Sequence, residues 1–300
     1  MRLAGILPIE IVCCDSQQVY VGMDVGTGKP TASEREAVPH HLLDLVQPTE
    51  VFHAARWAEL ARTVVGEVAA RGRVPVIVGG TGLYLRALGG GLFDAPPPDE
   101  AIRMRHREEA LRDGVETLHA RLATVDPETA ARVMPRDLMR ISRALEVFEQ
   151  TGVPISELRR RSTRASELRV ATVVLDPPLA ELRARISRRF DQMMAAGLLA
   201  ETRDLRTRFG PEARALGALG YRQIGDHLDG RLTLDEAVAA AKAATAAYAR
   251  RQRTWFRKEE GAWRAESPPE PDAVVQWWRA AAAGTGAGPT DPSASPVTES

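Results

Sequence analysis

The residues with the clearest chemical potential follow the apolar run Ile9–Cys14. Asp15 comes directly after this run and is followed by Ser16, Gln17 and Gln18. Short apolar runs rich in β-branched residues are typical of buried strands in a parallel sheet. In open α/β sheets the ligand crevice lies outside the carboxyl ends of such strands, where Asp15 is placed. The stretch therefore indicates a carboxylate at a ligand site, and an Asp that caps the next turn is an equally good interpretation.

A second candidate site follows the apolar run at 74–78. The sequence GGTG (79–82) ends this run and precedes an expected helix at 83–88. A strand, glycines, a hydroxyl and a helix in this order expose backbone N–H groups to an anion, although a tight strand-to-helix turn has the same pattern. Because Thr81 and Asp15 both follow strands, we expect them to share one site.

Other polar clusters are weaker signals. The loop 22–28 is rich in glycine and precedes Lys29, but it lacks the spacing of a nucleotide loop. His40 and His41 have no nearby partner in a metal-binding pattern, so we predict no metal site there. The sequence predicts a short strand over 40–46.

Arginine dominates the basic residues, since only three of the 40 basic residues are lysines. Helical spacing places Arg136, Arg140 and Arg143 near one face, which is also typical of a solvated face with salt bridges. The segment 250–257 interleaves arginine with Trp255 and Phe256. This pattern favours a nucleic-acid surface over a core stripe.

Composition excludes several classes of protein. The formal net charge of zero argues neither for nor against nucleic-acid binding. The two cysteines, Cys13 and Cys14, are neighbours on an expected strand, so neither a disulfide framework nor a cysteine metal cluster is expected. The amino end fails as a signal peptide and no apolar run reaches membrane-spanning length. We therefore expect a cytoplasmic protein that contacts no membrane.

The surrounding elements predict an α/β core that is interrupted by helices. The sequence predicts a helix over 54–71, a linker over 89–98, helices over 99–161, a returning strand over 168–176 and a long helix over 234–258. We predict that residues 1–92 and 166–279 form the α/β core, that 93–165 form an all-helical insertion, and that 280–300 form a disordered tail.

Five motifs together resemble one family. These are IEIVCCDSQQVYVGMDVGTGKP (9–30), VIVGGTGLYLRAL (76–88), RISRALEV (140–147), GYRQ (220–223) and RRQRTWFRK (250–258). Their order and spacing resemble those of the tRNA dimethylallyltransferases, the IPP transferase family, over residues 1 to about 265. The resemblance implies a P-loop-type parallel sheet with a helical insertion that grips the anticodon stem-loop.

The resemblance also implies an activity. Members transfer a dimethylallyl group from dimethylallyl diphosphate to N6 of adenosine 37 in tRNAs that read codons beginning with U, with Mg²⁺ assisting. The expected partners are therefore the tRNA anticodon stem-loop and dimethylallyl diphosphate, and we expect a monomer. The target base must be flipped out of a stacked loop, at a cost of a few kcal/mol.

The resemblance assigns catalytic positions to Asp15, Thr81 and Arg222. A carboxylate within hydrogen-bond reach orients an exocyclic amine and takes its proton, and a fixed guanidinium stabilises a departing diphosphate. The residues that the resemblance implies for tRNA binding are Asp15, Ser16, Gln17, Gln18, Thr81, Arg103, Met139, Arg140, Ile141, Ser142, Arg143, Gly217, Ala218, Leu219, Gly220, Tyr221, Arg222, Arg250, Arg251, Gln252, Arg253, Thr254, Trp255, Phe256 and Arg257.

One family motif is missing from the sequence. No G-x-x-x-x-G-K-[ST] phosphate loop occurs, so we expect the first strand, the diphosphate cradle and the usual Mg²⁺-binding hydroxyl to be absent. A start assigned too late would explain this, and we prefer it because Asp15, Thr81 and Arg222 are present. The alternative is a truncated protein that binds tRNA without transfer. A related enzyme acting on free adenine nucleotides is a third hypothesis, and the unpaired sheet edges predict poor stability.

Overall fold

The computed structural model describes residues 1–90, 96–161 and 168–283. The chain divides into two compact units, one formed by Met1–Leu88 with Leu168–Ser300 and the other by Gly89–Glu167. We call them unit 1 and unit 2. Within the described ranges, no helix combines the length and the apolar character that crossing a bilayer requires.

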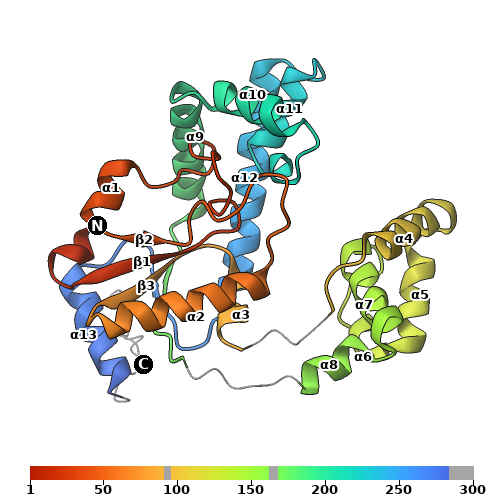
Figure 1. Ribbon diagram of the computed structural model, residues 1–300, viewed down its shortest axis with the longest axis horizontal. Helices are drawn as coiled ribbons and strands as arrows, with labels where there is room; N and C mark the ends of the chain where they lie inside the picture. Colours follow the sequence, from red (N-terminus) through yellow and green to blue (C-terminus); the bar gives the residue numbers. More distant parts are fainter. Residues whose placement is uncertain (91–95, 162–167, 284–300) are drawn as a thin grey trace, which may run out of the picture. The chain divides into compact units, whose positions relative to one another are not determined.

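Unit 1 contains a parallel sheet of three strands in the order β2-β1-β3. These are β1 (Ile9–Cys14), β2 (His40–His41) and β3 (Val74–Gly79). Every residue of β1 is buried, as expected for the middle strand of a covered parallel sheet. Figure 1 shows the three strands side by side, with α2 (Ala54–Ala70) running along them.

The predicted strand over 40–46 is too long. Only His40 and His41 pair with β1, because Leu42 and Asp44 adopt left-handed backbone conformations with φ of 64° and 53°. Such conformations are costly for residues with a side chain, and here ion pairs of Asp44 with Lys29 and Arg35 accompany the turn.

The predicted strand over 168–176 is also too long. Only β4 (Val173–Leu175) forms, and it pairs in parallel with β5 (Trp263–Ala265) in a separate two-stranded sheet. The sequence analysis missed β5, because a three-residue strand gives no periodic signal. Helix α13 (Pro271–Ala282) extends into the predicted tail, so disorder from residue 280 is wrong up to Ala282. Residues 284–300 lie outside the described part.

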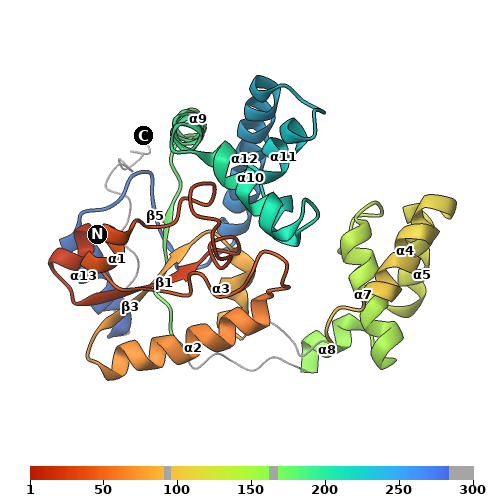
Figure 2. The ribbon, with the colours of Figure 1, turned by 45° about the horizontal axis from the view of Figure 1, so that its top comes forward.

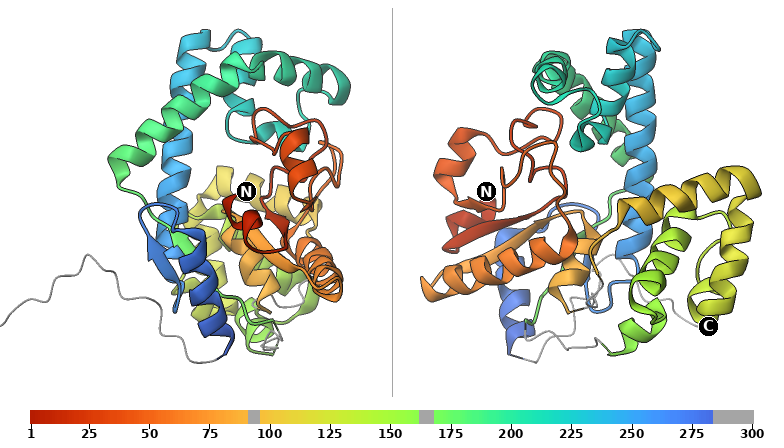
Figure 3. Two further views of the ribbon diagram at one scale, coloured as in Figure 1. Left: turned by 90° about the vertical axis from the view of Figure 1, so that its left-hand side faces the viewer. Right: turned by 45° about the vertical axis from the view of Figure 1, so that its right-hand side comes forward.

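Helices form the rest of unit 1. They are η1 (Arg2–Gly5), α1 (Ala32–Ala37), α3 (Gly82–Leu88), α9 (Leu179–Ala195), α10 (Leu198–Phe209), η2 (Arg214–Gly217), α11 (Tyr221–Leu228) and α12 (Leu234–Phe256). Helices α9 to α12 lie together in Figure 2, and both views in Figure 3 show α12 as the long helix that leads from this group toward the sheet. Their shared core includes Met23, Leu198, Tyr221 and Ile224.

Unit 2 is all-helical in its described residues. It contains α4 (Glu100–Asp113), α5 (Val115–Val125), α6 (Pro127–Ala130), α7 (Leu138–Thr151) and α8 (Ile155–Arg161). Its core includes the fully buried Leu118, Leu122 and Ile141. Gly152, with φ of 70°, ends α7 in the left-handed conformation that glycine adopts without strain. Residues 91–95 and 162–167, where the predicted boundaries of the insertion fall, lie outside the described part.

Candidate active site at the carboxyl edge of the sheet

Asp15 ends β1 and turns the chain through its own side chain. Its Oδ1 accepts hydrogen bonds from the backbone N–H of Gln17 at 2.7 Å and of Gln18 at 3.3 Å. This is the capping role that the sequence left open. Oδ2 accepts no hydrogen bond from any described residue, and the side chain is only partly buried. One oxygen therefore fixes the carboxylate, and the other is available to a ligand.

Thr81 lies beside this turn. Its Oγ1 accepts a hydrogen bond from the backbone N–H of Ser16 at 3.1 Å, and its own N–H donates to the carbonyl of Cys14 at 3.3 Å. The Cys14 thiol, which is buried, donates to the Thr81 carbonyl at 3.7 Å. The sheet register aligns Cys14 with Gly79, so the two strands end together. The structure thus brings Asp15 and Thr81 to one place, as the sequence predicts.

Helix α12 packs directly against the turn at 79–82. The Gln252 side-chain amide donates to the Gly80 carbonyl at 2.9 Å, and a Cβ at Gly82 would overlap the Trp255 indole nitrogen. The guanidinium of Arg86 lies over the Trp255 ring, 4.2 Å from its centroid, which is a cation–π contact. Glycine is therefore required at position 82 for α12 to approach this closely.

Tyr248 is a site residue that the sequence analysis missed. Its phenol lies near the side chains of Thr81 and Gln252, one turn along α12, and near Asp15. Burial and the negative charge of Asp15 raise the pKa of Tyr248, and the polar side chains of Thr81 and Gln252 oppose the shift only in part. The phenol is therefore a neutral hydrogen-bonding group at physiological pH. The positions 248, 252 and 255 are spaced as one helix face, and that spacing was the available signal.

Arg222 is less closely connected. It is the second residue of α11 and is exposed. Among the described contacts, no hydrogen bond or ion pair joins it to Asp15 or Thr81. Its neighbour Tyr221 is 1% exposed, so the aromatic ring of the GYRQ motif packs in the core and the guanidinium lies at the surface.

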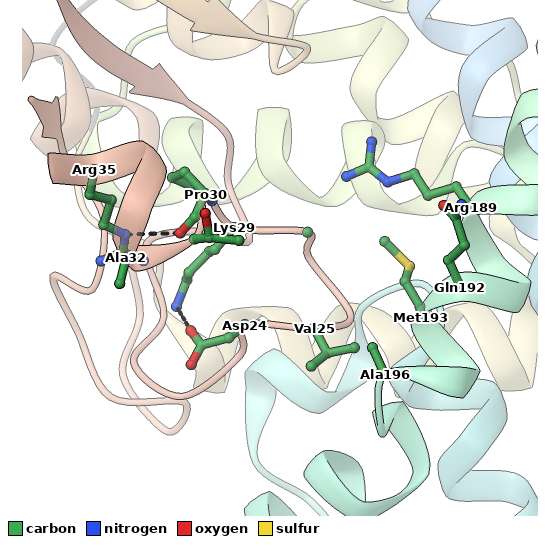
Figure 4. Close-up of a pocket in the computed structure, with 12 residues that line it drawn as sticks. Asp24, Val25, Lys29, Pro30, Ala32, Arg35, Arg189, Gln192, Met193 and Ala196 are labelled. Carbon is green, nitrogen blue, oxygen red and sulfur yellow. Dashed lines mark hydrogen bonds and ion pairs between the residues drawn. The ribbon is translucent and has the colours of Figure 1, made fainter. Parts of the chain in front are cut away.

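A pocket of about 770 Å³ lies beside this region in unit 1 (Figure 4). One wall is the loop from Asp24 to Ala32, and the other is the end of α9 around Arg189 and Met193. Lys29 does not reach into it as a free cation. Its Nζ donates to the Tyr20 carbonyl at 2.6 Å, Asp24 at 2.8 Å and Asp44 at 2.5 Å, and its side chain is 1% exposed.

The residues at the carboxyl end of α12 that are predicted for tRNA binding fall into an exposed group and a group that faces the protein. Arg250, Arg251, Thr254 and Arg257 are exposed. Gln252 and Trp255 instead face the turn at 79–82, and Arg253 forms an ion pair with Asp176 after β4. These three side chains thus make contacts within unit 1, because every third or fourth residue of the helix points inward, and tRNA binding by them stays a prediction.

Unit 2 shows a similar division. Met139 is 83% exposed and Arg140 is exposed, whereas Ile141 is fully buried and the Ser142 hydroxyl hydrogen-bonds with His106 at 2.9 Å. The side chains of Ile141 and Ser142 are thus packed inside unit 2, and their part in tRNA binding stays a prediction.

Glu146 holds two further residues of the predicted set. Its buried carboxylate accepts hydrogen bonds from Arg103 at 3.1 Å and from Arg143 at 2.8 Å. Both guanidinium groups are thus committed to a structural ion-pair network, since they satisfy a charge that would otherwise be buried alone. Only the guanidinium N–H groups of Arg103 and Arg143 that do not bind Glu146 can contact RNA.

Fold and site together define an α/β protein that presents a carboxylate, a hydroxyl and a phenol at the carboxyl edge of a parallel sheet. The family model described as IPP transferase matches residues 18–259. A tRNA dimethylallyltransferase of Anaeromyxobacter dehalogenans (strain 2CP-C) is 49% identical over 276 residues, 92% of this chain and 92% of the relative. A tRNA dimethylallyltransferase of Geobacillus thermodenitrificans is 44% identical and covers 86% of this chain and 82% of the relative. The chain belongs to the IPP transferase family.

Solved structures agree with this assignment. The full-length tRNA isopentenylpyrophosphate transferase of Bacillus halodurans is 36% identical with a TM-score of 0.65, and the match covers 94% of this chain and 90% of that one. A eukaryotic dimethylallyltransferase, described as acting on tRNA, has a TM-score of 0.75 at 22% identity, covering 98% of this chain and 77% of that one. The second likeness concerns the fold alone.

Proposed function

We propose that this family member transfers a dimethylallyl group from dimethylallyl diphosphate to N6 of adenosine 37 in the anticodon loop of tRNAs that read codons beginning with U. The observation that carries the proposal is the pairing of Asp15 and Thr81 at the carboxyl ends of β1 and β3, with one Asp15 oxygen free. Family membership supplies the reaction class, prenyl transfer.

The reaction needs a base because an adenine exocyclic amine is a weak nucleophile. N6 forms a bond to the allylic carbon, the bond from that carbon to the diphosphate oxygen breaks, and diphosphate leaves with its electron pair. Asp15 Oδ2 takes the proton that N6 loses. Thr81 and Tyr248 are proposed to orient the acceptor base, since both present hydroxyl groups next to Asp15.

Arg222 is proposed to stabilise the negative charge that develops on the departing diphosphate, for which a guanidinium is well suited. The exposed groups on α7 and α12 are proposed to contact the RNA. They are Met139, Arg140, Arg250, Arg251, Thr254 and Arg257. The carboxylate and guanidinium roles are separable by mutation, because no described hydrogen bond or ion pair joins Arg222 to Asp15.

The expected role of Mg²⁺ remains a proposal. In the described part of the chain, no group of three or more His, Cys, Asp or Glu side chains is arranged to hold a metal ion. Mg²⁺ usually keeps several waters and binds through one or two carboxylates and substrate phosphates, so the diphosphate would take the place of most protein ligands here. Omission of Mg²⁺ from the transfer assay, followed by its return, tests whether the reaction needs the ion.

The proposed function is tested by incubating the full chain with radiolabelled dimethylallyl diphosphate and an anticodon stem-loop that carries adenosine at position 37. We expect label on N6, and none when position 37 is guanosine. Binding of the stem-loop without any transfer would instead support a tRNA-binding protein. Transfer to AMP in preference to the stem-loop would support an enzyme of free nucleotides.

A further inference from the structure

The loop from Asp24 to Gly28 lies between two groups that do not touch each other, Asp15 and Arg222. On one side, the side-chain amide of Gln18 donates to the carbonyls of Thr27 at 3.2 Å and Gly28 at 3.3 Å. The backbone N–H of the same Gln18 donates to Asp15. The loop is therefore fixed directly to the Asp15 turn.

On its other side, the same loop is held by a single carboxylate. Glu201, on α10, accepts hydrogen bonds from three successive backbone N–H groups, those of Asp24 at 3.0 Å, Val25 at 2.8 Å and Gly26 at 3.0 Å. Three donors converging on one carboxylate form a charge-assisted and geometrically specific contact. No second side chain among the described residues holds these three amides.

Glu201 also holds the helix that carries Arg222. Its Oε1 accepts a hydrogen bond from the Tyr221 phenol at 2.6 Å, and Tyr221 immediately precedes Arg222. The Tyr221 ring lies so close to Gly26 that a Cβ there would come within 2.5 Å of it. The loop and the start of α11 are thus joined twice, by this carboxylate and by direct packing.

Lys29 closes the base of the loop. Its buried ammonium group joins the Tyr20 carbonyl, Asp24 and Asp44, and Figure 4 shows its side chain directed at Asp24 while Val25 projects toward Ala196. The base of the loop is therefore fixed by Lys29, and Glu201 holds its tip at 24–26 against α10 and Tyr221.

We infer that Glu201 is a positioning residue for prenyl transfer, because it ties the loop at 24–28 and the Tyr221–Arg222 segment together and so sets where Arg222 stands relative to Asp15. The inference rests on the proposed function of these two groups. Glu201 touches neither substrate nor the reacting atoms in this assignment. Its effect on catalysis passes through Arg222.

The test compares Glu201→Gln and Tyr221→Phe in the full chain with Glu212→Gln as the matched control. Glu212 is exposed and follows the same helix, α10. A glutamine at 201 has a similar shape but places an NH₂ group where the carboxylate accepts hydrogen bonds. We expect kcat to fall about tenfold or more, the KM for the stem-loop to change less than threefold, and amide hydrogen exchange to accelerate at positions 24–26. The control should leave all three unchanged.

A double-mutant comparison separates positioning from general loss of structure. In an Arg222→Ala background, Glu201→Gln should slow transfer less than twofold further, because the group that it positions is gone. If the rate losses of Glu201→Gln and Arg222→Ala multiply as independent effects, the inference is overturned. It is also overturned if the wild-type chain is active and the Glu201→Gln variant is equally active. If Glu201→Gln fails to fold, Tyr221→Phe with the Arg222→Ala pair decides by the same criterion. An inactive wild-type chain would instead refute the proposed function, and the exchange rates at 24–26 would still report on the contact itself.

Discussion

At the scale of single residues, the two interpretations of Asp15 are compatible with each other. One carboxylate oxygen caps the turn at Gln17 and Gln18, and the other accepts no hydrogen bond from the described residues. Capping is not a competing role, since it holds the side chain in one orientation and leaves the second oxygen for the proposed role as a base. A sequence pattern cannot divide two oxygens between two roles, because that division depends on backbone geometry.

Asp15→Asn tests the free oxygen alone. The amide oxygen still caps the turn, so the fold is kept, but the proton acceptor is lost. We expect the single-turnover rate of prenyl transfer to fall by roughly 10²–10⁴-fold. The control is Asp204→Asn, since Asp204 pairs with Arg208 on the surface of α10, and its rate should stay within twofold. A rate for Asp15→Asn within threefold of the wild type would rule out the proposed base.

Tyr248 gives a prediction about pH. Burial and the charge of Asp15 raise the pKa of its phenol above the ordinary value of 10, so the neutral form is favoured and persists below pH 10. We expect Tyr248→Phe to slow transfer about tenfold, equivalent to about 1.4 kcal/mol, because the hydroxyl proposed to orient the acceptor base is lost. The loss should be equal at pH 7 and pH 9. A loss that disappears at pH 9 would mean that the wild-type phenol ionises in this range, contrary to the environment described.

At the scale of elements, the sequence predicted the strands and helices that have a local, periodic pattern of residues. The strand Ile9–Cys14 was placed correctly because five of its six residues are apolar, and α2 ends at Ala70, one residue before its predicted end at 71. The length of β2 could not be predicted, since it depends on Asp44 reaching Lys29 across the loop. The sequence could not tell which side chains of α12 point inward, because arginine and aromatic residues occur on both faces of the helix.

The packing of α12 on the turn at 79–82 is tested by Gly82→Ala. A methyl group there overlaps the Trp255 ring, which also packs against the Arg86 guanidinium. We expect a loss of about 1–3 kcal/mol in the free energy of unfolding, the usual cost of overpacking, measured by urea denaturation. Gly66→Ala is the matched control, because Gly66 lies on α2 with open space around its Cα. It should be neutral or stabilise by up to about 1 kcal/mol. Equal effects at both positions would contradict the close approach.

At the scale of the whole molecule, the chain consists of two units, and each contains a buried carboxylate. Hydrogen bonding from Arg71, with His41 nearby, lowers the pKa of Glu10 in unit 1. In unit 2, burial opposes ionisation of Glu146, but hydrogen bonds from Arg143, the Asp99 N–H and Arg103 outweigh it and lower its pKa. The helical insertion could be predicted from composition. These partners could not, because they are far apart in the sequence and only the folded chain brings them together.

The lowered pKa values of Glu10 and Glu146 predict that the folded protein loses stability in acid. A carboxyl group whose pKa is lowered by folding contributes stability above its unfolded pKa, about 4.5, and that stability is lost as the pH falls through the folded value. We expect the free energy of unfolding to decline steadily below pH 4.5. Glu10→Gln should flatten that decline and cost about 1–3 kcal/mol at pH 7, since Arg71 loses its charged partner. An unchanged acid profile in this variant would show that Glu10 contributes nothing to it.

The buried pair Cys13 and Cys14 has a consequence for labelling chemistry. These are the only two cysteines of the chain, and burial raises the pKa of each thiol to about 12. Alkylating reagents attack the thiolate, which is scarce at neutral pH when the pKa is this high. The two native thiols should therefore react little, so that a fluorophore or spin label attaches selectively to an introduced surface cysteine. This holds even though Cys14 lies against Thr81 at the centre of the site.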